Sequence, residues 1–189
     1  MVALTVAVQG AADRPPSKDD ADSMRQKIMV IALQSISQAH DSRRTPVTEQ
    51  EVNAYLMYDA KDQLPQGVVD PSVSILGNGR LSGTATVDLD KVKAERQSTG
   101  FFDPMKLLSG RLPVSATGVL TSDNGMARLD LESTTVSGIR VPKSLLQSLV
   151  SYYSKTEQTP NGVNLDDPFP LPAGIKQIEV GKGQAVIVQ

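Results

Sequence analysis

Two apolar alternations of opposite parity flank the dipeptide Asn124-Gly125, and they constrain the fold more than any other feature of the chain. Small and apolar residues occupy even positions on the segment that ends at Leu120, and odd positions on the segment that begins at Ala127. A two-residue type I′ turn brings both sets to one face, because Asn and Gly accept its positive φ angles. The pattern therefore predicts an antiparallel hairpin that pairs Leu120 with Leu129.

A second hairpin is expected around residues 77–79, whose sequence is Gly-Asn-Gly. Apolar residues keep odd positions on both sides of it, so only a loop of odd length pairs Ile75 with Leu81 and Val73 with Gly83. We therefore predict a three-residue loop in which Gly79 is left-handed and forms a G1 bulge.

Helices are expected at three places. Residues 21–40 begin with acidic residues and are apolar over most of the helix circumference. Thr48 and Glu51 have the spacing of a capping box, which starts a second helix. Residues 143–155 carry an apolar stripe at helical spacing.

The last segment, residues 175–188, predicts a third hairpin with an ambiguous loop. Either Val186 and Val188 or Ala185 and Ile187 face inward. Together these elements predict an α+β fold: a long curved antiparallel sheet of hairpins, wrapped on one or two helices.

The N-terminal segment indicates export. Residues 2–8 are an apolar run followed by small residues, which is typical of the latter part of a secretory signal peptide. The alternative is a short edge strand or a tail. We assign residues 1–12 to a signal-peptide remnant, 13–20 to a polar tether and 21–189 to a single domain. Export predicts a location in the periplasm or cell envelope.

The amino-acid composition excludes several kinds of catalytic site. The 189 residues include no cysteine, no tryptophan and one histidine, so iron–sulfur, disulfide and multi-histidine metal sites are excluded. The net charge of −2 and the 4% aromatic content argue against nucleic-acid binding. His40 lies at a predicted helix end, where it suits the helix dipole. We therefore expect no catalytic residue, no metal and no cofactor, and a protein that is not an enzyme.

The inward faces of the predicted strands hold Val, Ala, Gly and Leu but no aromatic residue. Such faces, opposed by broad apolar helices, are compatible with a filled core or with a long hollow groove. Residue types alone leave both arrangements open.

The order of the sequence motifs along the chain gives further evidence on the fold. It resembles the LmeA-like phospholipid-binding family, a group of bacterial envelope proteins in the tubular lipid-binding (TULIP-like) class. The segments that carry the resemblance are residues 47–53, 79–90, 112–120, 136–142 and 169–180. The resemblance implies exported proteins with a half-barrel fold, in which a curved sheet cradles a helix and an apolar groove holds acyl chains.

Carried over residue by residue, that groove falls on the inward positions of the predicted elements. They are Ile28, Ile31, Ile75, Leu81, Ala85, Val87, Val114, Ala116, Leu120, Leu129, Leu131, Ile139, Leu145 and Leu149. The function expected is non-catalytic binding or transfer of a phospholipid or other amphiphile in the bacterial cell envelope, with contact to a membrane surface. The alternative is a structural or scaffold subunit that forms a homo-oligomer or joins an envelope complex through its N-terminal helix and sheet.

Overall fold

Two antiparallel sheets and several helices make up the computed structural model, which describes residues 14–36, 42–91, 110–153 and 160–189. The larger sheet has six strands, in the order β2-β3-β4-β5-β6, with β7 paired to β5. The smaller sheet has the order β1-β9-β8. The α+β class with a large antiparallel sheet is therefore confirmed.

The strands of the large sheet are β2 (Val68–Gly77), β3 (Arg80–Asp88), β4 (Arg111–Asp123), β5 (Met126–Val136), β6 (Ile139–Arg140) and β7 (Phe169–Pro170). The strands of the small sheet are β1 (Arg44–Thr48), β8 (Gln177–Val180) and β9 (Gln184–Val188). The helices are α1 (Lys18–Ile36), α2 (Glu49–Tyr58), the 3-10 turn η2 (Lys61–Gln63) and α4 (Lys143–Tyr153).

The β4–β5 hairpin has the predicted register. Leu120 pairs with Leu129 across a two-residue turn, in which Asn124 and Gly125 have φ angles of 49° and 80°. One bulge was not predicted: Glu132 is the extra residue on β5 where the register shifts. Beyond it, Thr134 rather than Ser133 takes the inward position opposite β4.

The β2–β3 hairpin has the predicted pairs but a different loop. Ile75 pairs with Leu81, and Gly79 is left-handed with a φ of 78°. The turn itself contains only Asn78 and Gly79, because Gly77 pairs with Arg80. Leu76 is the extra residue of β2 that lets Ile75 pair with Leu81 across a two-residue turn. It forms an isolated β-bridge with Lys182 instead of pairing with β3. The prediction of a three-residue loop was therefore wrong, although the required odd count was right.

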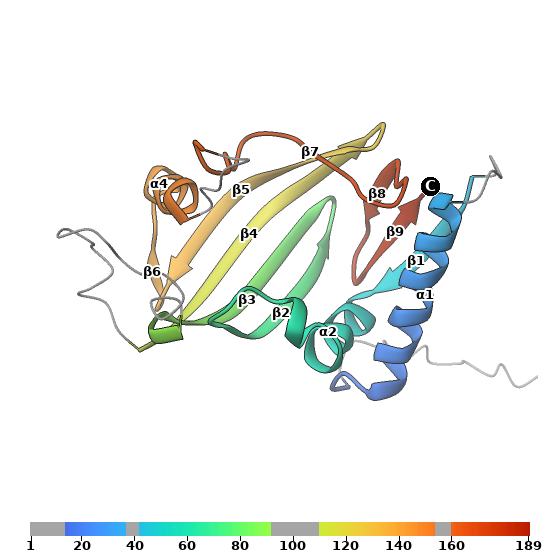
Figure 1. Ribbon diagram of the computed structural model, residues 1–189, viewed down its shortest axis with the longest axis horizontal. Helices are drawn as coiled ribbons and strands as arrows, with labels where there is room; N and C mark the ends of the chain where they lie inside the picture. Colours follow the sequence, from blue (N-terminus) through green and yellow to red (C-terminus); the bar gives the residue numbers. More distant parts are fainter. Residues whose placement is uncertain (1–13, 37–41, 92–109, 154–159) are drawn as a thin grey trace, which may run out of the picture.

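Both hairpin tips hydrogen-bond to β8 or to the residues just before it, and so join the two sheets. The amide of Gly79 donates to the Val180 carbonyl at 3.2 Å. Ser122 Oγ accepts from the Ile178 amide at 2.7 Å and donates to the Ile178 carbonyl at 3.1 Å. The amide of Gly125 donates to the Lys176 carbonyl at 2.9 Å. These bonds satisfy the outer edge of β8, and Figure 1 shows this junction to the right of the long strands.

The helices α1 and α2 lie at this junction, whereas α4 lies at the opposite end of the large sheet (Figure 1). Helix α1 begins at Lys18, so the last residues of the expected tether are helical. Its expected end near residue 40 and the expected signal remnant lie outside the described residues. The capping box at Thr48 and Glu51 is confirmed. The strand β1 just before it was not predicted, because it is short and contains Pro46.

Helix α2 covers the outer edge of β2 with two side chains. Asn53 accepts from the Val73 amide at 2.7 Å and donates to the Val73 carbonyl at 2.8 Å. Glu49 accepts from the Ile75 amide at 2.6 Å. Edge-strand groups that would otherwise remain open to pairing are thus satisfied, and α2 is fixed beside the sheet.

Candidate functional site

An apolar cavity of about 550 Å³ lies where the two sheets meet under α1 and α2. Its seventeen lining residues are all apolar. They are Met24, Ile28, Ile31, Ala32, Val47, Val52, Val73, Ile75, Leu81, Leu120, Pro172, Ala173, Ile175, Ile178, Val180, Ala185 and Ile187. This volume is within the range of about 300–1,000 Å³ that is usual for small-molecule sites.

Local periodicity explains how distant segments reach one cavity. Met24, Ile28 and Ile31 recur at four- and three-residue intervals, which places them on one face of α1. On β9, Ala185 and Ile187 share one face. The structure therefore resolves the ambiguity of the last hairpin in favour of this pair.

Five of the fourteen predicted groove residues line this cavity: Ile28, Ile31, Ile75, Leu81 and Leu120. They come from α1 and from the ends of β2, β3 and β4 nearest the small sheet.

The other predicted residues lie elsewhere. Six are half-buried on the large sheet but do not line the cavity; these are Ala85, Val87, Val114, Ala116, Leu129 and Leu131. Ile139 is 72% exposed at the β5–β6 hairpin, and Leu145 is 52% exposed on α4. Both lie at the end of the sheet away from α1, so their placement does not support a lining role. The side chain of Leu149 lies outside the described residues.

Sequence reasoning missed most of the small-sheet wall. Ile178 and Val180 on β8, together with Pro172 and Ala173 before it, complete the cavity. A signal for the strand residues was present, because both faces of the last hairpin are apolar in the sequence. No local pattern indicated that the loop at residues 172–175 would close one side.

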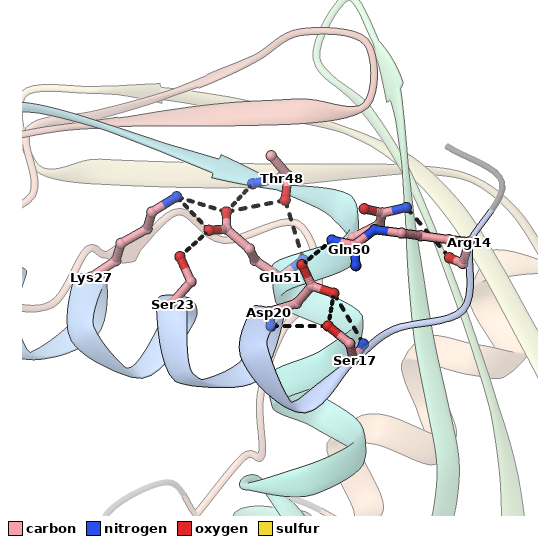
Figure 2. Close-up of polar contacts among 8 residues, drawn as sticks. All are labelled: Arg14, Ser17, Asp20, Ser23, Lys27, Thr48, Gln50 and Glu51. Atoms are coloured by element: carbon pink, nitrogen blue, oxygen red, sulfur yellow. Dashed lines mark hydrogen bonds and ion pairs between the residues drawn. The ribbon is translucent and has the colours of Figure 1, made fainter. Parts of the chain in front are cut away.

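The buried carboxylate of Glu51 connects α1 to the start of α2 (Figure 2). Lys27 Nζ lies 2.6 Å from Oε1, Ser23 donates to Oε1 at 2.6 Å, and the Thr48 amide donates to Oε2 at 2.8 Å. Burial raises the pKa of Glu51, but the bonds from Lys27, Ser23 and Thr48 outweigh it and hold the pKa below its ordinary value. Glu51 is therefore a charged anchor of the helix pair.

A second acidic group organises the start of α1. Asp20 accepts from the amide and the hydroxyl of Ser17 and from Arg14 at 2.6 Å, as Figure 2 shows. The Ser17 hydrogen bonds lower the pKa of Asp20 against the opposing effect of burial, and Arg14 lowers it further. Both carboxylates are saturated by structural partners, so neither has the free, raised-pKa character of an acid–base catalyst.

Another cleft, of about 750 Å³, lies between α2, η2 and β2. Its walls mix apolar residues such as Leu64 with charges of both signs, including Lys61 and Asp70. Across the described residues, no three His, Asp or Glu side chains come together in a way that would hold a metal ion. None of the described helices is both long and apolar enough to cross a membrane.

No known family model matches the chain, and no curated protein matches it. Among solved structures, it is similar to the crystal structure of a lipopolysaccharide binding protein, with 16% identity and a TM-score of 0.23. The match covers 82% of this chain and 45% of that chain. Similarity of this degree assigns no family, so membership of the LmeA-like family stays a prediction.

Proposed function

We propose that this chain binds the hydrocarbon part of a phospholipid or another amphiphile, without catalysis, in the cavity between α1, α2 and the two sheets. The observation that carries the proposal is the all-apolar lining of a cavity of about 550 Å³. Burial of an alkyl chain there contributes about 0.8 kcal/mol per methylene. Because methylene groups carry no directional information, we expect broad selectivity for the chain.

The proposal includes action in the bacterial cell envelope. The apolar run at residues 2–8 supports it, as does the pattern of segments that resembles envelope lipid-binding proteins. The lining contains no titratable or nucleophilic side chain, which supports binding rather than catalysis.

The test is chemical extraction of the purified chain. We expect organic extraction followed by mass spectrometry to release an amphiphile, and the extracted protein to bind added phospholipid again. If no lipid is extracted and neither phospholipid nor a fluorescent alkyl probe binds, the proposal fails.

The alternative function is a scaffold subunit, and one observation favours it. Met29, Leu33 and Ile36 are 59%, 57% and 79% exposed along one flank of α1. An exposed apolar flank of this kind is common at protein interfaces. Light scattering coupled to size-exclusion chromatography distinguishes the two functions, because a scaffold subunit assembles whereas a lipid carrier is able to act as a monomer.

A further inference from the structure

The two halves of α1 differ in charge. Residues 18–27 carry acidic and basic side chains, whereas residues 28–36 carry no charge. In the uncharged half, Met29, Leu33 and Ile36 share one flank and are 59%, 57% and 79% exposed. In the charged half, the same flank carries the ion pair between Asp22 and Arg25. The exposed surface of α1 therefore changes along this flank from ionic to apolar.

The apolar flank, formed by Met29, Leu33 and Ile36, is continuous with the cavity lining. At about 100° per residue, Ala32 lies about 40° from Ile28 and about 60° from Met29, between the cavity face of α1 and the flank. Ala32 lines the cavity and is also exposed. Apolar surface therefore runs from the cavity around the helix to the outside.

The cavity lining reaches the molecular surface at the same place. Of the lining residues that the structure describes, only Ala32 and Pro172 are exposed, and the others are buried or half-buried. The loop that holds Pro172 is tied to the uncharged half of α1, because Gln189 Nε2 donates to the carbonyls of both Ile31 and Ala173. The exposed part of the lining therefore borders the apolar flank.

We propose that the uncharged half of α1 docks on a lipid bilayer, with the apolar flank between the headgroups and the acyl chains. This half is about 13 Å long at 1.5 Å per residue. Interfacial helices bury their apolar face to a depth of about 5–10 Å, so the Asp22–Arg25 pair stays in water. The inference rests on the proposed function and names the source of its ligand, because docking places the exposed part of the cavity lining beside the bilayer.

A second copy of the chain is the competing occupant of the apolar flank. A stable protein interface takes about 20–30 residues from each partner, whereas this flank offers three large side chains. Further along the helix, Arg25 is already paired with Asp22 and Asp59. A bilayer needs no complementary surface, because apolar burial is not directional. The small, uncharged flank therefore favours a lipid surface.

Flotation of the full chain with phosphatidylcholine vesicles tests the inference. Ile36→Glu is compared with Ile139→Glu, a matched control in which the isoleucine is 72% exposed at the end of the large sheet away from α1 (Figure 1). We expect the vesicle affinity to fall about tenfold or more in Ile36→Glu and to stay unchanged in Ile139→Glu, because a carboxylate enters the interface unfavourably. Since the flank is uncharged, binding should persist at high salt.

Uptake of a fluorescent alkyl probe by the same variants separates this inference from the proposed function. If the wild type binds the probe but does not float, or if the two glutamate variants float equally well, the inference is overturned and the proposed function stands. Flotation that depends on Ile36 without probe uptake supports docking and contradicts the proposed function. If the wild type does not float and forms a dimer that Ile36→Glu dissociates, the flank binds a second copy and the inference is wrong.

A second measurement uses the absence of cysteine from the chain. Leu33→Cys and Ile139→Cys each introduce a single thiol, which is labelled with an environment-sensitive fluorophore. On addition of vesicles, we expect a blue shift of the emission in labelled Leu33→Cys and none in labelled Ile139→Cys. A shift at both positions, or at neither, overturns the inference.

Discussion

Both ends of the large sheet carry apolar side chains on one face, yet only one end contributes to the cavity. Ile75, Leu81 and Leu120 near the hairpin tips line it, whereas Ala85 and Ala116 further along the same strands do not. Apolar side chains alternate along the strands toward both ends. The difference lies in what is opposed to them, since residues of α1 and of the small sheet complete the cavity beside the hairpin tips.

Two ion pairs differ strongly in their exposure to solvent. The Lys27–Glu51 pair joins two helices beside the cavity, and its side chains are 25% and 9% exposed. The Arg80–Glu132 pair on the large sheet has side chains that are 51% and 37% exposed. Tertiary packing of α1 against α2 removes the Lys27–Glu51 pair from solvent, whereas the Arg80–Glu132 pair stays exposed although Arg80 lies at a hairpin tip beside the cavity.

The largest effect is expected from removing the buried carboxylate. Glu51→Ala deletes the partner of Lys27 and the capping box of α2, so we expect a loss of about 3 kcal/mol in the free energy of unfolding. The matched control Glu132→Ala removes an exposed pair and is expected to cost less than about 1 kcal/mol. Urea denaturation measures both. Equal losses would show that the difference in exposure of the two pairs has no effect on stability.

The next prediction concerns ligand binding. Ala185→Phe places an aromatic ring in the cavity, so we expect affinity for an alkyl probe to fall about tenfold or more. Ala116→Phe makes the same change on the large sheet outside the cavity and should alter affinity by less than about twofold. Probe titration measures both, with unfolding midpoints as a check on folding. Loss of binding in Ala116→Phe alone would instead indicate a groove along the sheet.

The smallest effect on stability is expected from alanine substitution of two turn glycines. Gly79 and Gly138 have nearly equal φ angles of 78° and 79°. A Cβ at Gly79 would lie 3.1 Å from the Leu120 carbonyl oxygen, whereas a Cβ at Gly138 meets nothing within 4 Å. Both alanine variants carry the left-handed strain of about 1 kcal/mol. We expect Gly79→Ala to cost about 1 kcal/mol more, because the turn packs against β4. Thermal denaturation of the pair tests this, and equal stability would contradict the packing role of the turn.

Local sequence determined a large part of the fold. The parity of the alternations predicted the pairing of Leu120 with Leu129 and of Ile75 with Leu81, because side chains in a strand repeat every two residues. The capping box at Thr48 predicted the start of α2 for a similar reason, since its hydrogen bonds span only three residues.

Only the tertiary structure decided which apolar residues share a site. Strand β1 pairs with β9, so that Arg44 lies opposite Val188, and no local pattern encodes a pairing over that separation. The same long-range packing brings Ile31, Ala173 and Gln189 together. The sequence alone predicted an apolar, non-catalytic surface. The size and the walls of the cavity follow from how the helices and the second sheet close over the hairpin tips.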